Sequence, residues 1–195
     1  MAKVTAPLFS FGASGQLAKA LVYFPFKGLD VVRSHVVPAN PNSAAQQVQR
    51  GYLGDAVDEW HAAGYTDADH GAFNRWASTL GKGLSGFNAF CRDHLDESVA
   101  GGTWRRMANA LVSALGATGF VVNITKVSGG DAPSIHYGVT PTFMPNTAVL
   151  VDQTGNDWEV TLAGLTSQTQ YYWYIDVGTP GSDHGRTGVY LTRTT

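Results

Sequence analysis

Two neighbouring runs of β-branched and aromatic residues, residues 17–26 and 29–37, constrain the fold of this chain most. Lys27 and Gly28 stand between them, and a two-residue interruption that contains glycine is typical of a β-hairpin turn. The second run carries apolar side chains at both alternating sets of positions, as does a strand that is buried on both faces or packed between subunits. Because a lone hairpin is at best marginally stable in water, we expect this one to need a third strand or a neighbouring molecule.

Prolines close this first region, and a helical pattern follows them. Pro38 and Pro41 favour extended backbone before themselves and end the second strand. Ser43 is placed to cap a helix whose apolar residues recur at three- and four-residue spacing, and Gly64 ends that helix.

Three more helices are predicted before residue 117. Thr66 and Asp69 form the pattern of a capping box, with aspartate in place of glutamate, and Ser85 is a candidate cap for the next helix. Beyond a Gly-Gly pair, residues 104–115 show a fourth helical period. The aromatic residues that we expect to form one core between the helices are Trp60, Phe73, Trp76, Phe87 and Phe90.

The hydrophobic period changes in residues 118–195. Short strand-like runs alternate there with clusters of Gly, Pro, Asn and Asp, which predicts a β-sandwich. The segment Leu-Thr-Ser-Gln-Thr-Gln-Tyr that ends at Tyr171 resembles the fibronectin type III pattern before a strand, with Ser167 in place of the usual proline. This resemblance implies that Tyr171 makes the corner hydrogen bond that joins the two sheets.

The predicted fold class is therefore α+β, with three parts. These are an extended arm or β-hairpin over residues 1–41, a small helical domain over residues 42–116, and a fibronectin III-like or immunoglobulin-like β-sandwich over residues 118–195.

Composition limits the partners of the chain. Charged residues make up 14% of it, against roughly 25% in typical domains. Low charge fits a surface that partners largely cover, although a glycine-rich β domain gives a similar bias. The net charge is −2, and residues 42–97 hold four basic against eight acidic residues, so we expect no nucleic acid as partner. We expect no membrane either, since no run approaches the roughly 18 apolar residues of a membrane span.

No catalytic or metal-binding signature stands out, and we expect a protein without catalytic residues, metal or cofactor. The six histidines are scattered singly, without the spacing of a zinc motif. Cys91 lies in a helical pattern, where a buried structural thiol is expected. Asp67 and Asp69 lie where a helix N-terminus favours negative charge. Residues 152–157 are read as a hairpin turn rather than a calcium loop.

Several motifs in residues 9–95 together are similar to a group of small phage and prophage virion structural proteins. The motifs are the Ser14-Gly15 turn, Lys27-Gly28, Val31-Val32-Arg33, Pro38-Ala39-Asn40-Pro41, Gln46, Arg50, Trp60, Trp76 and Ser85-Gly86-Phe87-Asn88. The resemblance implies a structural role in a virion and no enzymatic activity. An immunoglobulin-like or fibronectin-like tail is a common addition to such proteins.

We therefore expect a phage virion protein, synthesised in the host cytoplasm, that decorates or cements a capsid through its arm and helices. The expected partners are other virion proteins, whether capsid or tail subunits, and copies of the chain itself. Apolar and aromatic anchors usually carry interface energy. The residues expected to bind partners are Leu21, Tyr23, Phe24, Phe26, Val31, Val32, Arg33 and Val36.

An alternative function is that of a tail or adhesin-type protein whose β-sandwich binds host surface glycans. The aromatic residues considered for sugar stacking are Trp158, Tyr172, Trp173 and Tyr174. Strand alternation implies that two of residues 171–174 face the core, which leaves at most two of them exposed.

Overall fold

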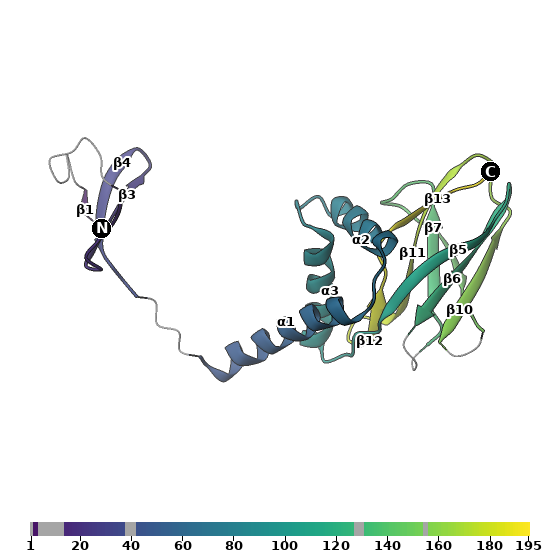
Figure 1. Ribbon diagram of the computed structural model, residues 1–195, viewed down its shortest axis with the longest axis horizontal. Helices are drawn as coiled ribbons and strands as arrows, with labels where there is room; N and C mark the ends of the chain where they lie inside the picture. Colours follow the sequence, from purple (N-terminus) through teal and green to yellow (C-terminus); the bar gives the residue numbers. More distant parts are fainter. Residues whose placement is uncertain (1, 4–13, 38–41, 127–130, 154–155) are drawn as a thin grey trace. The chain divides into compact units, whose positions relative to one another are not determined.

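A computed structural model describes residues 2–3, 14–37, 42–126, 131–153 and 156–195 (Figure 1). The chain divides into two compact units, Met1–Ser43 and Ala44–Thr195, and each is described here by itself. The described residues form a mixed α and β structure with three helices and three sheets, all of whose strand pairs are antiparallel.

The first unit contains a four-stranded sheet of order β1-β4-β3-β2. Its strands are β1 (Ala2–Lys3), β2 (Gly15–Leu17), β3 (Leu21–Phe26) and β4 (Leu29–Ser34). The predicted hairpin is confirmed: Phe26 pairs with Leu29, and Lys27 and Gly28 have φ values of 51° and 76°. Positive φ at both central residues defines the turn type whose twist matches a two-residue hairpin.

The predicted first run of residues 17–26 is not one strand. It bends at Ala18 and Lys19, which have φ values of 47° and 54°, so that Leu17 pairs with Leu21. Positive φ is uncommon for residues other than Gly, Asn and Asp, so neither residue type signalled this turn. The turn supplies the third strand that the hairpin was expected to need.

Three helices open the second unit: α1 (Ala44–Ala62), α2 (Asp67–Thr79) and α3 (Gly86–Ala100). The capping box is confirmed, because the Thr66 hydroxyl accepts a hydrogen bond from the Asp69 backbone and the Asp69 carboxylate accepts one from the Thr66 backbone. The Ser85 hydroxyl likewise accepts a hydrogen bond from the Asn88 backbone at 3.2 Å. Among the helices that the structure describes, none combines the length and apolar character of a membrane span.

The fourth predicted helix, over residues 104–115, is wrong, because residues Met107–Leu115 form strand β5. The strand pairs with β6, and its register shifts between Ala108 and Leu111 and again between Val112 and Ala114. Each shift interrupts the alternation of a strand by one residue. Apolar residues then recur at spacings that imitate a helix, and β5 belongs to the sandwich rather than to the helical region.

The remaining strands form two sheets, of order β5-β6-β10-β9 and β12-β11-β7-β8, and β13 pairs with β11 in the second sheet. They are β6 (Gly119–Lys126), β7 (Ser134–Gly138), β8 (Asn146–Val149), β9 (Val151–Asp152), β10 (Asp157–Ala163), β11 (Gln170–Thr179), β12 (Ser182–Arg186) and β13 (Tyr190–Arg193). The predicted hairpin turn at residues 152–157 lies between β9 and β10, where the Gln153 backbone donates a hydrogen bond to the Asp157 carbonyl at 2.9 Å.

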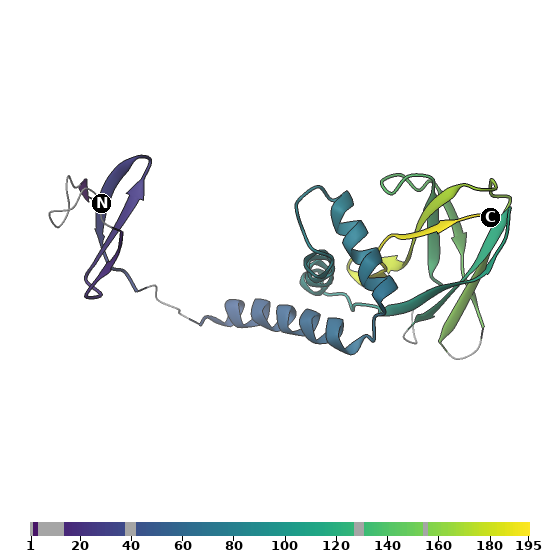
Figure 2. The same ribbon diagram turned by 45° about the horizontal axis from the view of Figure 1, so that its top comes forward.

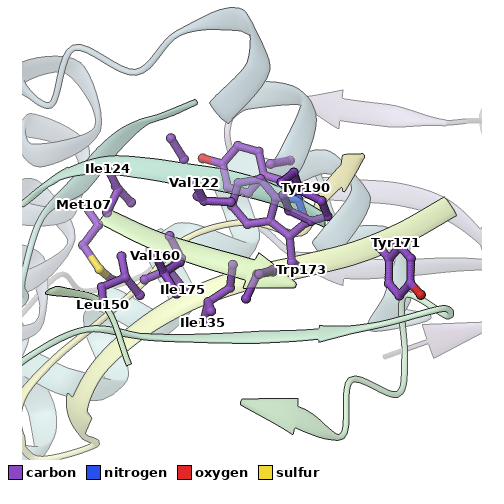
Figure 3. Packing of buried hydrophobic residues seen from close by; sticks show 14 of the residues in the cluster. Met107, Val122, Ile124, Ile135, Leu150, Val160, Tyr171, Trp173, Ile175 and Tyr190 are labelled. Carbon is purple, nitrogen blue, oxygen red and sulfur yellow. The ribbon is translucent and has the colours of Figure 1, made fainter. Parts of the chain in front are cut away.

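One core fills the space between the two sheets (Figure 3). Val122 and Ile124 of β6 and Val160 of β10 enter it from one side, and Trp173 and Ile175 of β11 enter it from the other. Apolar side chains on alternate positions of each strand thus explain why the two sheets pack face to face.

A second core lies between the three helices and the outer face of the β11 sheet. The five aromatic residues predicted to form a core all belong to it, either buried or packed against it. The Trp60 ring lies 5.3 Å from the Phe73 ring and 5.1 Å from the Phe90 ring, centroid to centroid. Helices α2 and α3 accordingly lie beside this sheet (Figures 1 and 2), and the unit has three layers.

The last strand of the sandwich is interrupted where α2 packs on it. Between β12 and β13 the backbone of Val189 leaves the sheet and donates a hydrogen bond to the Ala72 carbonyl in α2 at 3.0 Å. The Thr187 hydroxyl replaces a backbone carbonyl as acceptor in the strand pairing, because the Ile175 backbone N–H donates a hydrogen bond to it at 2.9 Å. Only glycine fits at position 188, because a Cβ atom there would lie 2.2 Å from backbone atoms of α2.

Candidate partner-binding surface

The arm sheet, formed by β1 to β4, carries apolar side chains on both faces. Phe24 lies opposite Val31 and Phe26 opposite Leu29, so these four residues share one face. Tyr23 lies opposite Val32, and successive residues of a strand point to opposite faces. Tyr23 and Val32 therefore share the other face, together with Leu17 and Leu21, which are paired with each other.

Large apolar side chains remain exposed on each face. Phe26 and Leu29 are 49% and 45% exposed on one face, and Leu17 and Leu21 are 45% and 37% exposed on the other. Exposed apolar patches on soluble proteins mark interaction sites. The arm sheet thus offers two small apolar surfaces, each of which a partner could bury.

Cationic side chains border the face of Phe24 and Phe26. The Arg33 guanidinium lies over the Phe24 ring at 5.3 Å, and the Lys27 ammonium lies 5.6 Å from the centre of the Phe26 ring. The two rings meet edge to face at 6.4 Å. A cation over an aromatic face is attracted by the ring and leaves its charge open to a partner, so this face combines apolar and positive character.

The structure brings seven of the eight predicted partner-binding residues onto β3 and β4, and Val36 follows β4 and is exposed. They do not form one patch, because the pairing distributes them over both faces. Val31 is buried and packs within the arm unit itself. Leu29 and Leu17 were missed, although their positions opposite Phe26 and Leu21 follow from the two turns.

The first half of α1 is a second surface with little packing of its own. Ala56 is the first buried residue of the helix, and Val48 and Leu53 before it are exposed. The figure shows this half standing clear of α2 and α3 (Figure 1). Because short isolated helices are marginal in water, a projecting half-helix is a natural place for further contacts.

The four residues considered for glycan stacking do not form a platform. Trp173 is only 1% exposed, stacks on Tyr190 at 4.4 Å and donates a hydrogen bond to Thr192, so it belongs to the core and cannot meet a sugar. Tyr172 and Tyr174 lie on the opposite face of β11, where the helices cover them in part. Trp158 packs against the edge of the core between the sheets. The expectation that two of residues 171–174 face the core is confirmed by Tyr171 and Trp173.

Tyr171 makes the predicted corner hydrogen bond. Its hydroxyl oxygen accepts a hydrogen bond from the Thr166 backbone at 3.0 Å, five residues upstream. This is the geometry of the tyrosine corner in immunoglobulin-like sandwiches. The resemblance of this segment to the fibronectin pattern therefore identified the contact, although proline is absent from it.

The groups with shifted pKa values are explained by burial in the fold. Burial raises the pKa of the Cys91 thiol, which opposes formation of a nucleophilic thiolate. Burial also lowers the pKa of His94, which packs between Phe90 and Trp104. In the part of the chain that the structure describes, no three His, Cys, Asp or Glu side chains gather as metal ligands.

Comparisons with known proteins add one partial likeness. No family model matches the chain, and no curated protein matches it. One similar solved structure is the crystal structure of the FN5 domain of Drosophila Lar, at 16% identity and a TM-score of 0.30. The match covers 44% of this chain and 90% of that chain. At this TM-score the likeness does not by itself assign the sandwich to a family.

Proposed function

We propose that this chain is a non-enzymatic structural protein of a phage virion, most simply a capsid decoration or cement protein. The arm sheet binds between subunits of the shell, and the three-layer body of residues 44–195 is displayed on it. Bound in this way, the protein adds buried interface across subunit boundaries and resists internal pressure from the packaged genome.

The observation that carries the proposal is the two-faced arm sheet. Residues 14–34 form three strands and their turns, and apolar groups on both faces of these strands are exposed. Burying a Phe or Leu side chain is worth about 1.5–3 kcal/mol, so a partner that covers both faces gains stability from each. The resemblance of residues 9–95 to small phage virion proteins is what suggests the class of partner.

We also propose that the sandwich is a fibronectin type III-like domain with helices added to one face. Two features support this: the hydrogen bond from the Thr166 backbone to the Tyr171 hydroxyl, and the placement of β5, β6 and β10 in one sheet with β7, β8 and β11 in the other.

Removal of the arm tests the proposed role. The variant that lacks residues 1–41 keeps every residue of the second unit, Ala44–Thr195, so we expect a folded, soluble protein that no longer binds particles lacking the wild-type chain. Circular dichroism checks folding, and co-sedimentation with particles measures binding. Full occupancy of the particles by the shortened protein would contradict the proposal.

A further inference from the structure

Aromatic and cationic side chains form a continuous stack on the outer face of the β11 sheet. The rings of His136 and Tyr174 stack 4.8 Å apart with an angle of 13° between their planes. The Arg186 guanidinium lies 4.1 Å from the centre of the Tyr174 ring and 4.7 Å from the centre of the Trp76 ring. Its planar group is thus held between β11 and α2 with only its N–H edge left for hydrogen bonding.

Arg186 has no carboxylate partner in the described part of the chain. None of the salt bridges among the described residues involves the Arg186 side chain, and its buried Nε atom has no hydrogen-bond acceptor there. Burial lowers the pKa of Arg186, yet an arginine stays charged near neutral pH. Aromatic faces compensate only part of the cost of removing a cation from water. The N–H groups of the Arg186 guanidinium are therefore suited to bind an anion.

A pocket of about 280 Å³ opens beside this guanidinium. Arg186 and the side chains of Thr79 and Thr142 supply its polar lining, and Leu80, Pro141 and Met144 supply apolar lining. The Thr79 hydroxyl donates to the Trp76 carbonyl, so its lone pairs remain for accepting a hydrogen bond. The volume lies just below the roughly 300–1,000 Å³ of small-molecule sites, which suits one ring-sized ligand.

We propose that this pocket binds a sugar acid, a single ring that carries one carboxylate and several hydroxyl groups. The carboxylate pairs with the N–H edge of Arg186, whose fork geometry matches its two oxygens. Hydroxyl groups of the ring bond to Thr79 and Thr142, and its C–H face packs on the apolar lining. This inference does not rest on the proposed virion role.

The surrounding charges favour a singly charged carboxylate over a phosphate. Asp93 and Asp176 lie close enough to act on Arg186 without forming an ion pair with it, and Arg92 opposes them. A phosphate ester carries about −1.5 to −2 charges at neutral pH, which exceeds the single positive charge of Arg186, and the nearby carboxylates repel the excess. A neutral sugar, in turn, leaves the guanidinium unpaired.

Titration of the full chain with D-glucuronate tests the proposal, with methyl glucoside and inorganic phosphate as comparison ligands. We expect saturable NMR shifts of the Arg186 and Trp76 side-chain N–H signals with glucuronate, and at least tenfold weaker effects with the other two. Absence of saturation by glucuronate would overturn the proposal. Equal binding of the glucoside or of phosphate would overturn its assignment to a sugar acid.

Two variants separate binding from stability. Arg186→Met removes the cation and should reduce glucuronate affinity at least tenfold, but it also removes the stack. Thr142→Trp fills the pocket from an exposed position outside the stack, so we expect the same loss of affinity with an unchanged melting temperature. Thr161→Trp, on β10 and outside this pocket, is the matched control and should bind normally. Unchanged affinity in Thr142→Trp would contradict the proposed site.

Discussion

The hydroxyl of Tyr190 donates a hydrogen bond to the carboxylate of Asp69, and this contact joins the first turn of α2 to the last strand of the chain. The same carboxylate accepts hydrogen bonds from Thr66 and from the Asn109 backbone in β5. Asp69 is fully buried. A helix cap therefore also fixes the position of the helical layer on the sandwich.

Tyr190→Phe should destabilise the protein by about 1–3 kcal/mol, because it leaves one buried carboxylate oxygen without its donor. Asp69→Ala should cost more, about 3–5 kcal/mol, since it leaves the donors of Thr66, Asn109 and Tyr190 without their shared acceptor. Urea unfolding at pH 7.5 measures both. The control Tyr52→Phe changes a half-exposed tyrosine of α1 and should shift the free energy of unfolding by less than about 0.5 kcal/mol. Equal effects of Tyr190→Phe and Tyr52→Phe would contradict this role.

The tyrosine corner gives a matched pair within one strand. Tyr171→Phe removes the acceptor of the Thr166 backbone N–H and should lower the free energy of unfolding by about 1–3 kcal/mol. Tyr172→Phe loses a hydroxyl that only accepts from the exposed Gln170 side chain, and its effect should stay below about 1 kcal/mol. Thermal unfolding of both variants decides, and a larger loss from Tyr172→Phe would refute the assignment.

His94 should make the protein less stable in mild acid. Burial lowers its pKa in the folded state, although Glu59 and Asp55 oppose the shift. The unfolded chain, with an ordinary histidine pKa near 6.5, therefore takes up the proton first as the pH falls. Stability is present above about pH 6.5 and declines below it, by at most about 1.4 kcal/mol per pH unit for this group.

Urea unfolding between pH 7.5 and 5.5 tests this expectation. His94→Leu should flatten the profile, and it also removes a buried Nδ1 atom that has no hydrogen-bond partner in the described residues. The exposed His61 provides the control, since His61→Gln should keep the acid-side decline. A profile of His94→Leu that matches the wild type would show that other groups cause the decline.

Each face of the arm should contribute separately to assembly. Phe26→Ser with Leu29→Ser changes one directly opposed pair, and Leu17→Ser with Leu21→Ser changes a pair on the other face. Each double variant should weaken binding to particles at least tenfold, because the serine side chains no longer gain the free energy of burying apolar surface at the interface. Lys19→Asn, at an exposed turn residue with φ 54°, should bind normally. Normal binding by either double variant would show that a partner covers only one face.

The parts of the fold that sequence predicted correctly are governed by neighbouring residues. The turn at Lys27 and Gly28, the box of Thr66 and Asp69 and the corner at Tyr171 each depend on contacts within five residues. Local chemistry at such positions selects one backbone conformation almost regardless of context.

The errors have non-local causes. Strand β5 owes its conformation to pairing with β6, and its two register shifts hide the alternation that would have indicated a strand. The pocket beside Arg186 depends on Trp76 and Tyr174, which reach it from α2 and β11. No spacing along the chain indicates that these side chains meet, so sequence grouped Tyr174 with Trp158, Tyr172 and Trp173, although the core encloses Trp173.

The interruption at residues 187–189 has a consequence for anyone who would use the sandwich alone. The Arg75 side chain donates to the Val189 carbonyl at 2.6 Å, and Val189 donates to Ala72, so the last strand is completed by α2. A fragment that starts at residue 118 would lack β5, uncover Tyr174 and leave Val189 without its donor and acceptor. Residues 44–195 thus form a portable piece of this body, and fusions or display scaffolds should retain its helices.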